Sequence, residues 1–163
     1  MIELEQVLRL PVVVEHTIPP TWLDANGHMN MMYYTGLGNM SFDRFFKVLG
    51  IPFEHFRGRG RSFFALQQVL YYLNELREGD KVEVHSGLVG HDAKRIHFIY
   101  YVVNLSTGKL ASTDERISSY MDMTARRTTP FEPDIVEQLD RALAFFDGLG
   151  WTPELSGTIK LKK

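Results

Sequence analysis

The chain has 163 residues, of which 44% are hydrophobic and 23% are charged. This composition excludes a disordered chain, and the length suffices for one compact domain with a sizeable core. The formal net charge of -2 excludes a general binder of polyanions, so any phosphate must be held by local clusters of basic residues.

The absence of cysteine excludes disulfides, a thiolate nucleophile and Cys-based zinc sites. The N-terminal stretch carries acidic residues and lacks the basic region and long apolar run of a signal peptide. The longest apolar runs are too short to cross a bilayer. We therefore expect a cytoplasmic protein that binds neither membrane nor nucleic acid.

Taken in chain order, the pattern predicts one strand, a loop, one long helix, four long strands and a terminal helix. Three consecutive valines favour a strand over 11–18, and the density of Gly, Asn, Asp and Pro predicts a loop over 21–30. The remaining expected elements are a helix from 30 to 49, a basic loop over 56–61, strands over 62–72, 81–89, 95–104 and 109–122, a helix over 132–146 and a loosely held tail over 148–163.

The long helix has the clearest signature. Apolar residues recur at the i, i+3, i+4, i+7 spacing of a helix with one buried face, namely Phe42, Phe45, Phe46 and Leu49. Asn30 is a favoured N-cap, and Gly50 followed by Pro52 ends the helix. Gly36 and Gly38 lie inside it, where each costs about 1 kcal/mol relative to Ala, so we expect both to pack closely against a sheet.

An early helix followed by a strand-rich remainder indicates an α+β fold, in which an antiparallel sheet of five strands packs on that helix. Short polar connections at 90–93 and 106–108 suit antiparallel hairpins. In the strand over 95–104, the side chains of Ile96, Phe98, Tyr100 and Val102 share one face. Such a sheet leaves an open edge, which favours a homo-oligomer, either a dimer or a tetramer.

The most informative stretch runs from Trp22 to Asn30 and contains Asp24, Gly27, His28 and Asn30 in a D-x-x-G-H-x-N pattern. This pattern, between a first strand and the one long helix, resembles the signature of hot-dog thioesterases related to 4-hydroxybenzoyl-CoA thioesterase. The resemblance continues more loosely through Tyr34 and 77–80 and covers most of residues 10–140. It implies a single hot-dog domain over 1–163, with its core in about 10–140, that acts on acyl-CoA without a cofactor.

Thioester hydrolysis needs a nucleophile, which is a carboxylate or a water that a carboxylate activates, and a donor for the oxyanion. Asp24 can supply the first. The backbone N–H of Met31 lies just after Asn30, at a helix N-terminus, where unpaired donors and the macrodipole favour negative charge. The resemblance assigns the same roles to these two residues.

The other residues of the pattern have more than one interpretation. Gly27 permits a positive φ or close approach of the thioester. Asn30 is a helix cap that aims the amide donors, and His28 either orients loop and substrate or is a structural histidine. The structural alternative for Asp24 is an Asx turn that folds the loop.

The chain departs from the family pattern in two places. Many relatives carry a second Asn after the first and a Glu further along the helix, where this chain has Met31 and Asn39. A helix-borne catalytic Glu is thus absent. Asp43 and Glu54 are substitutes in principle, although surface carboxylates are usually only solvated.

Coenzyme A needs cations for its phosphates, and three clusters are candidates: Arg57, Arg59 and Arg61; Lys94 and Arg95; and Arg126 and Arg127. The alternative is that each cluster is a solvated face. His91, Asp92 and His97 do not have the spacing of metal ligands, so we expect no metal site.

Two other functions remain open. A hot-dog dehydratase would remove water from a 3-hydroxyacyl thioester, and a non-catalytic acyl-CoA-binding protein would use the same fold as a sensor. The Asp-first loop fits hydrolysis better than dehydration. The chain shows neither a spare helix-turn-helix nor a basic domain, which a DNA-binding sensor would need.

The segments 22–30, 72–75, 79–80 and 92–98 are also similar to those of betainyl-CoA thioesterases. A trimethylammonium acyl group is selected by aromatic faces and nearby negative charge. Candidates for such faces are Trp22, Tyr33, Tyr34, Phe63 and Tyr72. Gln67 and Gln68 lie where an acidic residue would be expected, so the firmer expectation is a short, compact acyl group.

Overall fold

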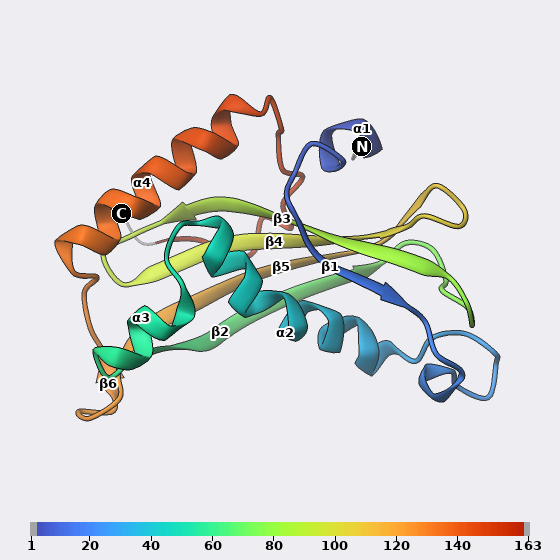
Figure 1. Ribbon diagram of the computed structural model, residues 1–163, viewed down its shortest axis with the longest axis horizontal. Coiled ribbons are helices and arrows are strands. Elements are labelled where there is room, and N and C mark those ends of the chain that lie inside the picture. Colours follow the sequence, from blue (N-terminus) through green and yellow to red (C-terminus); the bar gives the residue numbers. More distant parts are fainter. Residues whose placement is uncertain (1–2, 162–163) are drawn as a thin grey trace.

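The computed structural model describes residues 3–161 and shows a curled antiparallel sheet around one long helix (Figure 1). The strand order is β1-β3-β4-β5-β2, and β6 adds a short pairing to β5. In chain order the elements are α1 (Leu4–Val7), β1 (Val12–Thr17), a 3₁₀ turn (Pro20–Trp22), α2 (Met31–Val48), α3 (Phe53–Gly58), β2 (Arg61–Tyr72), β3 (Lys81–His91), β4 (Arg95–Asn104), β5 (Lys109–Asp122), β6 (Arg127–Thr128) and α4 (Pro133–Gly148). This is the hot-dog arrangement that the sequence predicts.

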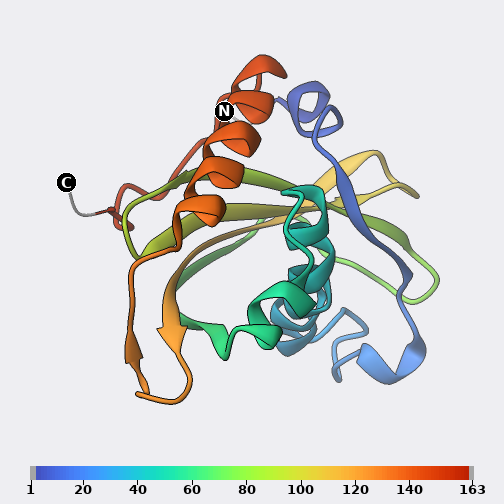
Figure 2. The ribbon, with the colours of Figure 1, turned by 60° about the vertical axis from the view of Figure 1, so that its left-hand side comes forward.

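Helix α2 begins and ends where the sequence predicts. The Asn30 side chain caps its N-terminus by accepting a hydrogen bond from the Met32 N–H at 3.1 Å. At the other end Gly50 has a φ of +77°, a left-handed conformation that glycine adopts without strain. The sheet wraps around this helix, as Figure 2 shows. The N-terminus of α2 thus lies beside the loop before it, and its C-terminus lies beside α3.

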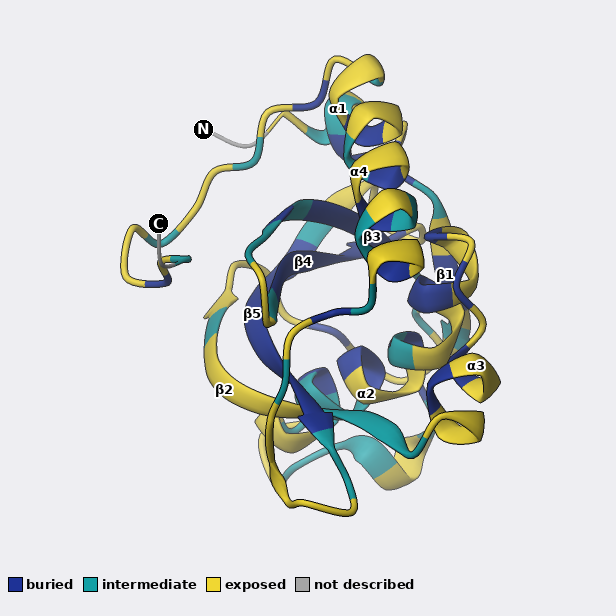
Figure 3. Ribbon diagram, turned by 90° about the vertical axis from the view of Figure 1, so that its left-hand side faces the viewer, coloured by how far each residue is buried: buried dark blue, intermediate teal, exposed yellow. Residues whose placement is uncertain are grey.

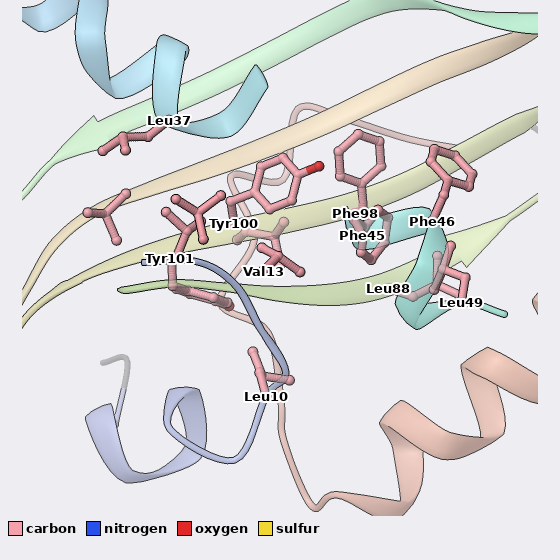
Figure 4. Packing of buried hydrophobic residues seen from close by; sticks show 14 of the residues in the cluster. Leu10, Val13, Leu37, Phe45, Phe46, Leu49, Leu88, Phe98, Tyr100 and Tyr101 are labelled. Carbon is pink, nitrogen blue, oxygen red and sulfur yellow. The ribbon is translucent and has the colours of Figure 1, made fainter. Parts of the chain in front are cut away.

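The core lies between α2 and the concave face of the sheet, and Figure 4 shows part of it. Phe45 and Phe46 on α2 are fully buried. The Phe45 ring lies 5.1 Å from that of Phe98 and 5.9 Å from that of Tyr100, both on β4. Large aromatic side chains contribute much of the apolar area that a core removes from water. The face of β4 predicted from its alternation is thus the one that packs on the helix.

Two regions differ from the sequence-based expectation. Residues 53–58 form helix α3, not a loop, because Phe53 and Phe56 are spaced one turn apart and both bury against α2. The C-terminal segment is not loose over its described part: Trp151 is 8% exposed and packs on Gly87 and Tyr101, and Ile159 is 5% exposed. Residues 162–163 lie outside the described residues.

The two helical glycines have different environments. A Cβ at Gly38 would lie 2.3 Å from Nη2 of Arg116 and 2.7 Å from Oδ2 of Asp114, so the predicted close packing against the sheet is confirmed there. Around Gly36 no described atom of the chain lies within 4 Å of such a Cβ, so close packing within the chain is wrong for this residue. A side chain at position 36 would therefore meet no described atom of the chain within 4 Å of its Cβ.

The buried ion pair beneath Gly38 has little freedom to move. Arg116 donates to both oxygens of Asp114, to Oδ1 of Asn39 and to the Thr35 carbonyl. Its guanidinium also lies 5.4 Å from the centroid of the Tyr100 ring. Burial raises the pKa of Asp114, and the Arg116 guanidinium opposes this rise. A displaced Arg116 would leave a buried charge without its partner.

Gly38→Ala is therefore expected to destabilise the fold by about 2 to 4 kcal/mol, the range for disrupting a buried ion pair. Urea unfolding followed by circular dichroism measures this loss. Gly36→Ala is the matched control on the same helix, and it is expected to be neutral or stabilising by up to about 1 kcal/mol. Equal effects of the two substitutions would show that the Asp114 and Arg116 contact does not require a glycine.

Candidate active site

The loop before α2 is folded by its own backbone and by one carboxylate. Asp24 N–H donates to the His28 carbonyl at 2.9 Å, and Gly27 N–H donates to the Asp24 carbonyl at 3.1 Å. Oδ1 of Asp24 accepts from the N–H groups of Asn26, at 2.8 Å, and His28, at 3.4 Å. Gly27 has a φ of +76°, as predicted. Asp24 therefore does form the Asx-type turn that was its structural alternative.

The two backbone N–H groups of the turn donate to the same oxygen of Asp24, Oδ1. The Asn26 side chain also lies beside the carboxylate and favours its ionised form. The N–H of Asn26 holds the pKa of Asp24 below its ordinary value, with smaller contributions from His28. The group is thus an ionised carboxylate at neutral pH, the form that a base or nucleophile needs.

The loop is joined to helix α2 and to the segment after β2. Asn30 N–H donates to the Trp22 carbonyl at 2.8 Å, which returns the chain to the helix start. Met29 N–H donates to the Leu76 carbonyl at 2.7 Å, which joins the loop to residues 73–76. The Met31 N–H, at the first helical position, has no acceptor in the described part of the chain. It is free to bind a carbonyl oxygen.

A cavity of about 480 Å³ lies between these segments. Its lining comprises Asp24, His28, Met29, Asn30, Met31, Tyr34, Tyr72, Leu73, Asn74 and Glu75. Four of the five predicted site residues, Asp24, His28, Asn30 and Met31, thus line one cavity, and Gly27 lies in the turn beside it. A carboxylate and the amide end of a helix therefore face the same space.

Three further residues of the cavity are Tyr34 and Tyr72, which the sequence suggested as aromatic faces, and Glu75, which it did not single out. The Tyr34 ring is 5% exposed and meets the Tyr72 ring edge to face at 5.1 Å. Burial raises the pKa of Tyr34, so its phenol stays neutral. Glu75 lies 2.8 Å from His28, between its Oε2 and the ring Nε2. Glu75 belongs to the segment 72–75, which is similar to that of betainyl-CoA thioesterases. No local signal in the sequence marks Glu75 as a neighbour of His28.

Other predicted aromatic faces are not open to a ligand. Trp22 is stacked between His16, at 4.5 Å, and Tyr33, at 4.7 Å, so both of its faces are covered. Phe63 belongs to the aromatic core, where it contacts Phe46 and Tyr120. Of the five aromatic residues considered for a cationic acyl group, Tyr34 and Tyr72 are the ones that line the cavity.

The predicted CoA-binding cations lie at the opposite end of α2 from Asp24. Figure 1 shows α3 and β6 at one end and the loop before α2 at the other. The helix between them has 18 residues and is thus about 27 Å long. A single chain therefore separates Asp24 from Arg57, Arg59, Arg61, Lys94 and Arg95.

Several of these cations already have carboxylate partners. Arg59 makes two hydrogen bonds to Asp134, at 2.7 and 3.0 Å. Arg61 contacts Glu132 and Asp122, each at 2.9 Å. These pairs tie β2 and the segment before it to the start of α4.

Lys94 and Arg95 lie at another position, on a second cavity of about 650 Å³ that Leu66 and Thr128 also line. Arg95 pairs with Asp92. Lys94 has no carboxylate within ion-pair distance among the described residues, and Arg57 instead lies over the Phe53 ring at 5.4 Å. The charge of Lys94 is therefore more available to a ligand in this cavity than the charge of Arg95.

The carboxylates Asp43 and Glu54 are exposed and lie outside the Asp24 cavity.

In the described part of the chain, no helix has the length and apolar character needed to span a bilayer. No group of three or more His, Asp or Glu residues suited to a metal ion occurs within residues 3–161. The groups that line the Asp24 cavity include two carboxylates, a histidine, two tyrosines and the N-terminus of α2.

Several known proteins are similar to this chain in sequence or in fold. The betainyl-CoA thioesterase of Pseudomonas aeruginosa is 28% identical over 142 residues, which cover 83% of this chain and 89% of that protein. A putative thioesterase from Pseudomonas putida KT2440 superposes with a TM-score of 0.76 at 23% identity, over 94% of this chain and 98% of the other. A Staphylococcus aureus hypothetical protein in complex with CoA superposes with a TM-score of 0.75 at 21% identity, over 94% and 96%.

These structures share the hot-dog fold with this chain. The family model described as the thioesterase-like superfamily matches residues 18–139, about three quarters of the sequence. The matched range contains the whole Asp24 loop, α2 and the four long strands β2 to β5. The chain belongs to the thioesterase-like superfamily.

Proposed function

We propose that this protein hydrolyses acyl-CoA thioesters of short, compact acyl groups, with Asp24 as the central carboxylate. The observation that carries the proposal is that Asp24 and Met31 line one cavity, where Asp24 supplies a carboxylate and Met31 a backbone N–H that has no acceptor in the described chain. In this scheme the Met31 amide binds the thioester oxygen, where one donor is worth about 3 to 4 kcal/mol in the transition state. Asp24 activates water or attacks the carbonyl carbon itself.

Asp24→Asn is expected to lower kcat by at least about a hundredfold, because the variant loses the base or nucleophile. The amide retains the Oδ1 acceptor of the turn, so folding is expected to be preserved. Thiol release from acyl-CoA, followed with a thiol-reactive dye, measures the rate. Near-normal turnover would remove Asp24 from the mechanism, alkene formation would indicate the dehydratase alternative, and binding without turnover would indicate a sensor.

The working unit is, in this proposal, at least a dimer formed through β2. The outer edge of β2 has no strand partner in residues 3–161, and Figure 3 shows this strand exposed along much of its length beside the buried β4 and β5. Leu66, at a bulge in the middle of β2, is 56% exposed. An unpaired edge of 12 residues is a template for pairing with another strand.

A two-fold axis near Leu66 would also complete the site. Antiparallel pairing of two β2 strands places the start of one strand opposite the end of the other. The cations near the start of β2 in one subunit would then approach the Asp24 cavity of its partner, which lies at the end of β2. Among them, Lys94 is the candidate for a CoA phosphate, since its charge is the one on the second cavity without a carboxylate partner.

Leu66→Glu is expected to convert the oligomer to a monomer and to abolish most of the activity, because the charge faces its symmetry mate across the axis. Multi-angle light scattering and the thiol assay measure the two effects together. Leu105→Glu is the control, since Leu105 is 47% exposed but lies in the turn between β4 and β5. A fully active monomer at assay concentrations would refute both the dimer and the shared site.

The acyl group is the finer part of the proposal, and betainyl-CoA is the candidate. The betainyl nitrogen is separated from the carbonyl carbon by a single methylene, so its binding groups must lie beside Asp24 and Met31. The cavity meets this condition: Tyr34 and Tyr72 supply aromatic rings, and Asp24 and Glu75 supply negative charge. Cations bind aromatic faces with about 0.5 to 2 kcal/mol.

Betainyl-CoA is therefore expected to exceed tert-butylacetyl-CoA, its uncharged isostere, by about tenfold in kcat/KM, and palmitoyl-CoA to be a poor substrate. Tyr72→Leu is expected to reduce the preference for the cation while sparing the isostere. Equal rates for the two isosteres would remove cation selectivity from the proposal. A preference for palmitoyl-CoA would also remove the short acyl group.

A further inference from the structure

His28 and Glu75 come together because two loops share a backbone hydrogen bond. The Met29 N–H donates to the Leu76 carbonyl at 2.7 Å, and Leu76 is fully buried, which anchors its loop. The residues preceding these two, His28 and Glu75, are then neighbours, and Nε2 of the ring lies 2.8 Å from Oε2 of the carboxylate. Both side chains line the Asp24 cavity.

Glu75 is itself held in place. Its other oxygen, Oε1, accepts from Nε of Arg77 at 2.8 Å and from Nη2 at 2.6 Å. The backbone N–H of Arg77 in turn donates to Oδ2 of Asp80 at 2.9 Å, and Asn104 donates to the same oxygen. One carboxylate oxygen thus binds the arginine, and the other is left for the imidazole.

This arrangement determines what the imidazole can do. With Nε2 directed at Glu75, Nδ1 has no hydrogen-bond partner within residues 3–161. The charged and titratable groups around the ring are Asp24 on its own loop, Tyr34 on α2, Tyr72 on β2, and Glu75 with Arg77 behind it. The contact between Oε2 of Glu75 and Nε2 is an ion pair, and a carboxylate paired with one ring nitrogen orients the ring. The opposite nitrogen can then donate a proton.

We propose that Glu75 is the positioning residue for His28 and that His28, so held, protonates the CoA sulfur as it leaves. This inference rests on the proposed function. When water attacks the carbonyl carbon, Asp24 takes one proton and the C–S bond breaks with its electron pair on sulfur. Nδ1–H of the His28 imidazolium donates to that sulfur, and the neutral ring regains the proton that Asp24 holds. Water and thioester thus give acid and thiol, with both residues restored.

The test compares two thioesters of butyrate, one of CoA and one of 4-nitrothiophenol, because an uncharged acyl group does not depend on the charge of Glu75 for binding. The aryl thiolate is a much weaker base than the CoA thiolate and leaves without a proton, so general-acid catalysis contributes little to its departure. Glu75→Gln keeps the shape and an acceptor oxygen but removes the charge. It is expected to lower kcat on the CoA ester by about ten- to a hundredfold, with KM within about twofold, and kcat on the aryl ester by less than about twofold.

His28→Gln is expected to show the same dependence on the leaving group, which guards against a folding defect specific to position 75. Glu78→Gln is the matched control, since Glu78 is an exposed carboxylate in the same loop outside the cavity, and it is expected to behave as wild type. An equal loss on both esters, or no loss on the CoA ester, overturns the role of Glu75 and His28. If wild type is active and Asp24→Asn is not, such a result defeats this inference alone, whereas an inactive wild type defeats the proposed function.

Discussion

The burial of helix α2 against the concave face of the sheet is the constraint on which the rest of the structure depends. Phe45 and Phe46 anchor the C-terminal half of the helix, and the Arg116–Asp114 pair fixes the middle at Gly38. A helix held along its length cannot turn its N-terminus away from the loop that precedes it. The amide donors of the first turn are therefore presented to the cavity without further cost at the time of binding.

In the proposed mechanism, one carboxylate of this loop serves structure and chemistry together. Oδ1 of Asp24 closes the Asx-type turn, and the hydrogen bonds that it accepts also favour the ionised state. The geometry thus does not force a choice between a structural and a chemical role for this residue. A base whose position is fixed by backbone donors also loses little conformational entropy in the reaction.

Local pattern predicted most of the fold, because strands and helices follow from periodicity and caps. The limits of α2, the four long strands and the N-cap at Asn30 all have signals within a few residues. Contacts between distant segments have no such signal. Arg59 reads as a free cation, yet its partner Asp134 is 75 residues away, and α3 was missed because its two buried phenylalanines sit in a basic stretch.

The candidate site divides in the same way. Asp24, His28 and Asn30 belong to one motif and Met31 follows it directly, so sequence brought them together. Glu75 comes from the segment after β2, which the Met29 to Leu76 hydrogen bond joins to the loop. Gln67 and Gln68 occupy the positions where an acidic residue was expected. Gln68 donates to Asp114 on β5, but Arg116 already neutralises this carboxylate, which therefore supports the helix and does not bind a ligand.

The distribution of charge separates the two ends of an acyl-CoA. The Asp24 cavity is lined by two carboxylates and one histidine, which disfavours phosphates and tolerates a cationic acyl group. The cations predicted to bind CoA lie about a helix length away, at the other end of α2. An acyl-CoA is therefore expected to place its short acyl group in the Asp24 cavity and its anionic CoA part outside it. Within a single subunit, that CoA part does not reach the predicted CoA-binding cations. In the proposed dimer, antiparallel pairing through β2 would reverse that relation, because it would bring the basic end of one chain to the acidic cavity of the other.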